Sequence, residues 1–269
     1  MFVLHGGPSF DHNYLLPEMD RLSDSFRLIY YSQRGRGLSA DGVEPQDVTM
    51  GSEVEDLDFL RMWFELDQVA LIGHSWGGFL AMCFALAHPE HVSYMILLNT
   101  APASYADWQL VLANFGPNRP AADREVLDRL ADDEAYQSGD LETERDHNRA
   151  HFRMTVRRVD LLEELVGRIR VNFTVESLLK ARRIGQRLGE ETLERPDFDL
   201  LRALSRLDIP TLVISSEFDF IPAETGSHIA EAMPLGRHEA LDGLGHFSFL
   251  EDPDRVSAVI NAFVAAGTD

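Results

Sequence analysis

The sequence has 269 residues, of which 45% are hydrophobic and 26% are charged, so it can form one large α/β domain with an ample core. Its formal net charge of -21 argues against a protein that binds nucleic acid or anionic membranes, because no basic surface is available to neutralise phosphates. Cys83 is the only cysteine, so no disulfide can form within the chain. Neither a signal-peptide pattern at the amino terminus nor an 18-residue apolar stretch is found, and we expect a cytoplasmic protein.

Strand-like and helix-like segments alternate over the first hundred residues. Short apolar runs without polar alternation predict buried strands, which begin at Phe2 and cover 26–32, 69–73 and 92–99. Helical patterns lie between these runs, over 11–25, 52–66 and 77–89. This alternation of continuous apolar strands with helices predicts a parallel sheet that is covered on both faces.

The pattern changes from Ala101 to Ser205, where helical segments follow one another without a convincing strand. We therefore expect a doubly wound, mostly parallel α/β core built from residues 1–100 and 206–269. The segment 101–205 would form an inserted all-helical cap, which lies over one edge of the sheet as a lid.

Alternation returns in the last third of the chain. Strands are predicted over 211–215 and 236–243, and helices over 223–233 and 253–267. At the start of the last helix, Asp252 is suited to be the N-cap and Pro253 the first helical residue.

The residues Gly73-His74-Ser75-Trp76-Gly77 fit the pattern G-x-S-x-G between a predicted strand and a predicted helix. In such a turn the glycines remove the collisions that larger side chains would cause, and the serine is held with its Oγ exposed. The backbone N–H of Trp76 then points to where an oxyanion would form, at the amino terminus of a helix. Ser75 is the predicted nucleophile.

A nucleophilic serine needs a base and a carboxylate that orients the base. His246 lies in a glycine-flanked loop after the last predicted strand, and Asp219 follows the strand before it, giving the chain order Ser, Asp, His. Glu217 competes with Asp219, but its distance from the strand end is less suitable. We expect activity to fall at acidic pH, because a protonated His246 cannot accept the proton of the serine.

The stretch HGGP at His5–Pro8 ends the first predicted strand. Its small residues let backbone N–H groups approach a substrate carbonyl, so we assign the second oxyanion donor to Gly7, with Gly6 as the adjacent alternative. A glycine loop for nucleotides is rejected, because neither G-x-G-x-x-G nor a G-K-[ST] ending is present.

Two further patterns fall in the predicted cap. His147 and His151 are spaced i, i+4, but no glutamate or third ligand accompanies them, so we predict an ordinary helix and no metal site. The segment 121–146 contains ten acidic residues and three arginines, which is typical of a solvated helix face. Its position above the nucleophile leaves open that some of these acids face a substrate.

These motifs together resemble the α/β-hydrolase superfamily over nearly the whole chain. Within it the sequence is most similar to the proline iminopeptidase group, through HGGP, YYSQRGRGLS at 30–39, GHSWGG at 73–78 and the cap segment 138–158. The resemblance implies a Ser75-His246-Asp219 triad, no cofactor, and a short-peptide or small-molecule substrate whose N-terminal residue is released.

In that group, carboxylates of the cap hold the free amino terminus of the substrate, and the resemblance points to Glu142 and Glu144 for this role. Three residues depart from the group's usual pattern, namely Ser9, Ser32 and His74. The family also has a β-hairpin ahead of HGGP, whereas only four residues precede His5 here. We therefore expect the strand at 26–32 to be an exposed apolar edge that pairs with a second chain. The alternative expectation is that the natural protein extends further upstream.

Three functions are compatible with these residues. The first is a serine aminopeptidase that acts on an N-terminal proline or a similar small residue. The second is a carboxylesterase or lactonase that uses the same triad on a neutral acyl group, and an apolar cap pocket would favour it. The third is a ligand receptor without catalysis on the same fold.

Overall fold

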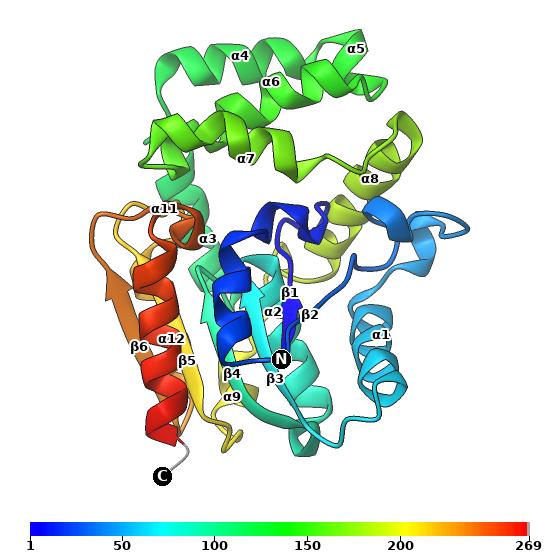
Figure 1. Cartoon of the computed structure of the whole chain (residues 1–269). Helices are drawn as coiled ribbons and strands as arrows, with labels where there is room; N and C mark the ends of the chain where they lie inside the picture. The colour runs from blue at the N-terminus through cyan, green and yellow to red at the C-terminus, as the bar shows by residue number, and fades with distance from the viewer. Residues whose placement is uncertain (268–269) are drawn as a thin grey trace.

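A computed structural model describes residues 1–267 (Figure 1). Six strands form one sheet in the order β2-β1-β3-β4-β5-β6, and every neighbouring pair is parallel. The strands are β1 (Phe2–Leu4), β2 (Ile29–Tyr30), β3 (Val69–His74), β4 (Val92–Leu98), β5 (Thr211–Ser216) and β6 (Gly236–Leu241). The parallel α/β sheet predicted from the alternation of segments is confirmed.

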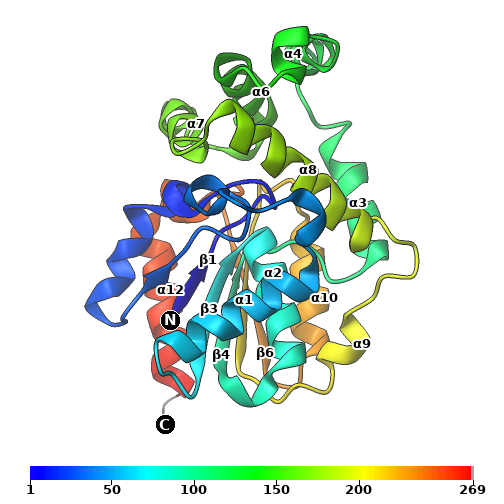
Figure 2. The same cartoon turned by 90° about the vertical axis from the view of Figure 1, so that its right-hand side faces the viewer.

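Helices cover both faces of this sheet (Figure 2). One face carries α1 (Met50–Trp63), α2 (Trp76–Ala87), α9 (Leu201–Leu204) and α10 (Ala223–Ala232). The other carries the 3-10 helix η2 (Glu18–Asp24), α11 (Ser248–Glu251) and α12 (Pro253–Gly267). The backbone N–H of Arg255 donates to Oδ1 of Asp252 at 3.1 Å, which confirms the predicted N-cap of the last helix.

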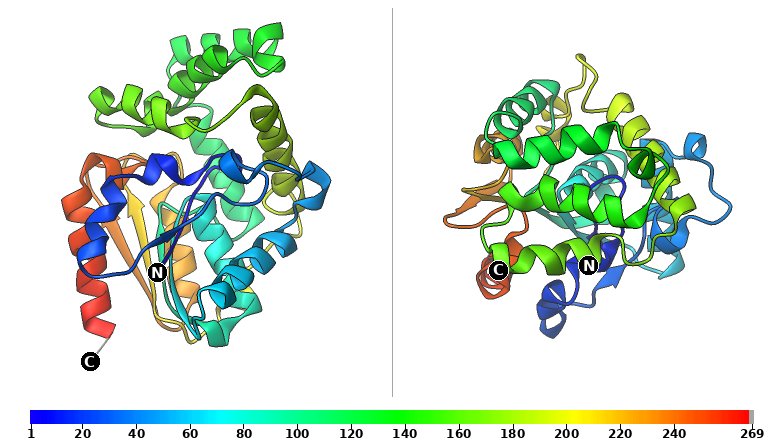
Figure 3. Two further views of the ribbon diagram at one scale, coloured as in Figure 1. Left: turned by 45° about the vertical axis from the view of Figure 1, so that its right-hand side comes forward. Right: turned by 90° about the horizontal axis from the view of Figure 1, so that it is seen from above.

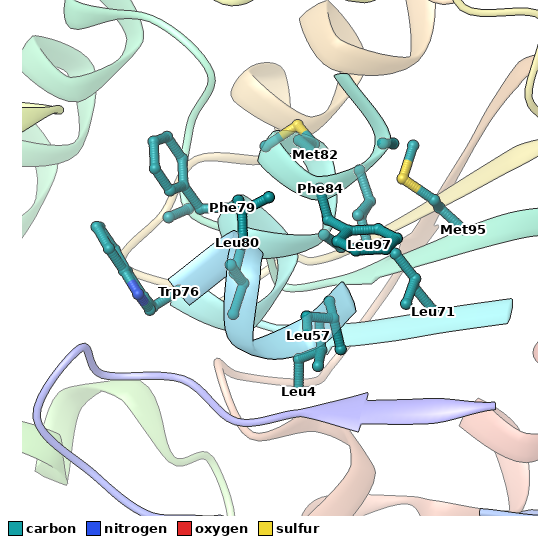
Figure 4. Packing of buried hydrophobic residues seen from close by; sticks show 14 of the residues in the cluster. Leu4, Leu57, Leu71, Trp76, Phe79, Leu80, Met82, Phe84, Met95 and Leu97 are labelled. Carbon is teal, nitrogen blue, oxygen red and sulfur yellow. The ribbon is translucent and has the colours of Figure 1, made fainter. Parts of the chain in front are cut away.

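Two hydrophobic cores result, one on each side of the sheet. Alternate residues of a strand belong to different cores: Leu4 and Leu71 face α2, whereas Val3 and Ile72 face α12. Figure 4 shows the first core, where the aromatic and aliphatic side chains of α2 lie against those of β3 and β4. Because both faces are covered, β3 is buried along its whole length, which explains its continuous apolar sequence.

Between residues 101 and 205 the described structure is helical, apart from a single bridge between Ser104 and Asp199. Besides α9 and two short 3-10 helices, η6 (Arg153–Thr155) and η7 (Val159–Leu161), the helices here are α3 (Tyr105–Phe115), α4 (Ala121–Ala131), α5 (Glu134–Gln137), α6 (Leu141–Phe152), α7 (Leu162–Ile169) and α8 (Val175–Glu191). Helices α4, α6 and α7 lie side by side across the end of the sheet where the strands point, as the view from above shows (Figure 3). The whole segment 101–205 is called the cap below.

Two elements differ by more than a few residues from their predicted extents. The strand predicted over 26–32 covers only Ile29–Tyr30, which pair with Phe2 and Val3 of β1. The helix predicted over 11–25 consists of two 3-10 helices, η1 (His12–Leu15) and η2, since Pro17 between them lacks the N–H that an α-helix needs.

Strand β2 is one of the two edge strands of the sheet, and its second edge pairs with no strand of the described residues. Pairing of this edge with a second chain stays a prediction, which the molar mass in solution would test. No helix within residues 1–267 is long and apolar enough to cross a membrane.

The close packing of α2 against the sheet leads to a stability prediction. A Cβ atom on Gly77 would lie 2.1 Å from the carbonyl oxygen of Leu4, so Gly77→Ala should lower the free energy of unfolding by about 3 kcal/mol. Gly167→Ala is the matched control, because a Cβ there meets no atom within 4 Å and the exposed site in α7 favours alanine by about 0.5–1 kcal/mol. Urea unfolding followed by circular dichroism measures both. Equal stability of the two variants would contradict the packing argument.

Candidate active site

Ser75 occupies the turn between β3 and α2 with φ 54° and ψ -118°, a conformation that side chains rarely adopt. Glycines on both sides make this turn possible. A Cβ on Gly73 would lie 2.2 Å from the carbonyl oxygen of Gly77, and a Cβ on Gly77 would collide with Leu4 of β1. The serine is therefore held where the strand ends, at the edge of the sheet that the cap covers.

His246 and Asp219 form a buried pair at the same edge. Nδ1 of His246 lies 2.9 Å from both carboxylate oxygens of Asp219, so the ring N–H donates to the carboxylate. The backbone N–H of Ile221 also donates to Asp219, at 2.9 Å. Ser75 lines the same cavity as His246, and within residues 1–267 no hydrogen bond joins its Oγ to the ring. In ligand-free enzymes such bonds are commonly long and tighten when substrate binds.

Asn99 is a residue of this site that the sequence did not reveal. It follows β4 with a positive φ of 45°, and its amide donates to Oδ2 of Asp219 at 2.8 Å and to Oγ of Ser216 at 3.0 Å. The hydroxyl of Ser248 donates to the amide oxygen at 2.7 Å. Asn99 therefore fixes the carboxylate that orients the histidine.

The loop after β1 supplies a free backbone donor. The N–H of Gly6 donates to the Tyr14 hydroxyl at 2.6 Å, whereas the N–H of Gly7 has no partner in the described part of the chain. Gly7 has a positive φ of 48°, which glycine adopts without strain. Trp76 is the first residue of α2, where backbone N–H groups are unpaired by geometry. Within the described residues, Gly7 is thus the one of the two glycines whose backbone N–H is free, as is that of Trp76.

This loop is supported from beneath by the segment 30–39. The backbone N–H of Gln33 donates to Nε2 of His5 at 3.0 Å, and its side-chain amide donates to the carbonyl of His5 at 2.9 Å. Arg36 is fully buried, donates to the carbonyl of Pro8 at 2.6 Å and forms an ion pair with Glu53. Burial, assisted by Arg36, lowers the pKa of His5 to about 3, so this histidine stays a neutral part of the scaffold.

A buried chain of hydrogen bonds connects the loop of Gly6 to the loop that carries His246. The hydroxyl of Tyr14 accepts from Gly6 and donates to Nδ1 of His74 at 2.7 Å, and Nε2 of His74 donates to the carbonyl of His246 at 3.0 Å. Burial, followed by the nearby His246, keeps the pKa of His74 well below its usual value. His74 is therefore neutral. Only a neutral ring can accept a hydrogen bond at Nδ1 and donate one from Nε2, as this chain of hydrogen bonds requires.

Above Ser75 the core and the cap enclose a cavity of about 360 Å³. Its walls are mainly apolar, and their aromatic residues include Trp76, Trp108, Phe115, Phe152, Phe220 and Phe247. His151 also lines it, and burial lowers the pKa of this histidine to about 3, so its ring is neutral. The cavity is suited to a compact apolar group.

One carboxylate lies on the wall of this cavity, and it is not one that the sequence suggested. Glu194 follows α8 and lines the cavity, and within residues 1–267 its carboxylate makes no ion pair. Glu194 is an exposed residue, so water reaches its side chain from outside the cavity. Its spacing in the sequence carries no motif, and only the fold brings it to the cavity that Ser75 also lines.

The two acids suggested by the resemblance are placed differently. Glu142 is 85% exposed in its side chain and lines neither this cavity nor its neighbour. Glu144 is buried and paired with Arg170 at 2.9 Å and with Arg182 at 2.5 Å. Burial acts to raise the pKa of Glu144, but the two arginines outweigh it and the pKa is lowered. Neither acid is free in this structure to hold an amine beside Ser75.

A family model described as alpha/beta hydrolase fold matches residues 1–253. This chain belongs to the alpha/beta hydrolase fold family. Among curated relatives, the proline iminopeptidase of Saccharolobus solfataricus is 24% identical, over 98% of this chain and 84% of its own length. That of Lactobacillus acidophilus is 27% identical, over 99% of this chain and 90% of its own length.

Solved structures agree on the fold of this hydrolase. A proline iminopeptidase from Mycobacterium smegmatis superposes with a TM-score of 0.72 at 22% identity, covering 99% of this chain and 89% of the other. An esterase from Thermogutta terrifontis superposes with a TM-score of 0.66 at 22% identity, with the same coverage. At these identities the structural likeness supports the fold alone. Within residues 1–267 no group of three or more His, Cys, Asp or Glu side chains could hold a metal ion.

The Tyr14–His74 chain yields a prediction for a positioning residue. Tyr14→Phe removes the partner of the Gly6 N–H and of Nδ1 of His74, so we expect kcat on p-nitrophenyl butyrate to fall about tenfold while KM changes less than about twofold. Leaving buried polar groups unpaired should also lower the free energy of unfolding by about 1–3 kcal/mol. Tyr94→Phe is the control, because this half-buried tyrosine lies on β4 away from the cavity. A loss of stability without a loss of kcat would show that Tyr14 only supports the fold.

Glu144 yields a prediction for the pH dependence of stability. Because its pKa is lowered in the folded state, its ionised form stabilises the fold above its ordinary pKa, and this contribution is lost as pH falls. Glu144→Gln should therefore lower the free energy of unfolding by about 3 kcal/mol at neutral pH, with the difference shrinking below about pH 4.5. Glu142→Gln is the matched exposed control and should change little. A difference that does not vary with pH would contradict the ion-pair explanation.

Proposed function

We propose that this hydrolase releases an N-terminal proline, or a residue of similar size, from short peptides or amides through an acyl-enzyme. The observation that carries the proposal is the unpaired carboxylate of Glu194 on the wall of a mainly apolar cavity above Ser75. A proline ring would fill the aromatic part, and its charged amine would pair with Glu194. The curated relatives named proline iminopeptidase support the same assignment.

In this proposal Ser75, His246 and Asp219 act together as a catalytic triad. Oγ of Ser75 attacks the carbonyl carbon and His246 accepts its proton, while Asp219 stabilises the charged ring. The backbone N–H groups of Gly7 and Trp76 bind the oxyanion of the tetrahedral intermediate. His246 then protonates the leaving amine. In the second half of the reaction His246 accepts a proton from the water that attacks the acyl-enzyme, and returns it to Oγ of Ser75 as the acid is released.

The charge of the whole molecule favours a cationic substrate. A net charge of -21 produces a negative potential around the protein, which raises the local concentration of amines and slows the approach of free anions. This effect is not specific for a peptide, but it acts in the same direction as Glu194.

A carboxylesterase or lactonase is the second candidate. It is favoured by the apolar lining of the cavity, where aromatic rings outnumber the single carboxylate of Glu194. A neutral acyl group would fill the same space and would leave Glu194 in contact with water.

The decisive measurement compares proline p-nitroanilide with p-nitrophenyl butyrate on the parent and on Glu194→Gln. An amine that pairs with Glu194 should lose about tenfold or more in kcat/KM when the charge is removed, so the ratio of amide to ester hydrolysis should fall by that factor. Glu190→Gln is the matched control, because this exposed glutamate of α8 does not line the cavity.

Ser75→Ala supplies the background rate for both substrates. Ester hydrolysis by the parent without amide hydrolysis would replace the aminopeptidase with the esterase. Hydrolysis of neither substrate above the Ser75→Ala rate would favour a ligand receptor on this fold.

A further inference from the structure

A second cavity of about 330 Å³ lies between the core and the cap, next to the one above Ser75. The two cavities share six lining residues, Gly7, Pro8, Phe10, His151, Phe152 and Gly185. Because the proposed oxyanion donor Gly7 borders both, a substrate whose carbonyl lies at Gly7 can extend one part into each cavity.

The second cavity is positively charged, although it belongs to a strongly acidic protein. Arg170 and Arg182 contribute two charges and Glu144 contributes one of opposite sign, which leaves a net charge of about +1 near neutral pH. His147 adds no charge there, because burial lowers its pKa despite the nearby Glu144. An amine would be repelled from this cavity, and a monoanion would be attracted.

Three nitrogen atoms of its lining residues lack a partner in the described chain. They are Nε of Arg182, Nδ1 of His147 and Nδ2 of Asn148, and each is buried. Arginine and asparagine nitrogens can only donate, and the histidine nitrogen donates in one of its tautomers. A buried donor without an acceptor costs about 1–3 kcal/mol, so a ligand with several acceptor oxygens would remove that penalty.

The two guanidinium groups are held in place before any ligand binds. Arg170 is 7% exposed in its side chain, stacks 4.8 Å from the ring centres of both Phe10 and Phe173, and donates to Ser9. Arg182 lies 3.9 Å from the ring centre of Tyr136. Side chains fixed in this way lose little entropy on binding, which is typical of a built recognition site.

We propose that the second cavity is a subsite for a carboxylate of the substrate, bound by Arg182, Asn148 and His147. This inference rests on the proposed function, in which the carboxylate is the C-terminus of a di- or tripeptide whose N-terminal residue lies above Ser75. The enzyme then selects short peptides, because both charged ends must be bound at once. Arg170 and Glu144 are the paired groups that keep Arg182 in position.

The test compares peptides that differ only in the C-terminal charge. We expect kcat/KM for Pro-Ala or Pro-Ala-Ala to exceed that for the corresponding C-terminal amide by about tenfold, the gain of one charge-assisted contact. The preference should decline as NaCl is raised from about 50 mM to about 500 mM. A parent enzyme that cuts acid and amide equally well overturns the proposal.

Arg182→Met removes the proposed cation, and the ratio of acid to amide hydrolysis should fall to about 1. Arg183→Met is the matched control, because this exposed neighbour on α8 does not line the second cavity and should retain the ratio. If Arg182→Met fails to fold, Asn148→Ala removes one of the unpartnered donors without touching an ion pair, and the ratio should fall about threefold. An unchanged ratio in a folded variant overturns the assignment of that residue.

A pair of esters separates failure of the subsite from failure of the proposed function. Absence of hydrolysis of proline p-nitroanilide and of every proline peptide refutes the aminopeptidase. The subsite is then tested with 3-acetoxybenzoate and its methyl ester, which differ in the charge of the leaving group. Faster hydrolysis of the acid that depends on Arg182 supports the carboxylate subsite in an esterase, and equal rates refute it.

Discussion

The contact between the start of α2 and the end of β1 is the constraint on which the site depends. Only glycine at position 77 allows the helix to approach Leu4, where any Cβ would lie 2.1 Å from a carbonyl oxygen. This approach forces the tight turn at Ser75 and brings the Gly7 loop beside the amino terminus of the helix. The positions of the proposed nucleophile and of both proposed oxyanion donors are therefore consequences of one packing contact.

The remaining groups depend on the parallel order of the sheet. Because every strand points the same way, the loops after β4, β5 and β6 open at one edge, and Asn99, Asp219 and His246 meet there although long segments separate them. The cap then fixes the loop of the base, since the backbone N–H of His246 donates to the carbonyl of Thr155 at 2.8 Å. Movement of the cap would consequently displace His246 as well as open the cavity.

Much of this arrangement was predictable from the sequence, because it is encoded locally. The glycines around Ser75, the apolar runs of the strands and the cap of the last helix each depend on neighbouring residues. Tyr14 and His74 were not predictable as partners, since 60 positions separate them and each looks like an ordinary core residue. The length of β2 was also not predictable from its apolar run, because a strand extends only where a neighbouring strand pairs with it, and β1 pairs with two of its residues.

The acids of the cap show most clearly why sequence alone was insufficient. In the sequence Glu142 and Glu144 are equivalent members of an acidic run, but helix α6 turns one toward water and the other against Arg170 and Arg182, which lie 26 and 38 positions further along the chain. Pairing converts Glu144 from a site for an amine into a support for two cations. The charge that a substrate meets is thus decided by the packing of cap helices, and an acidic protein can carry a cationic cavity next to the one that Ser75 lines.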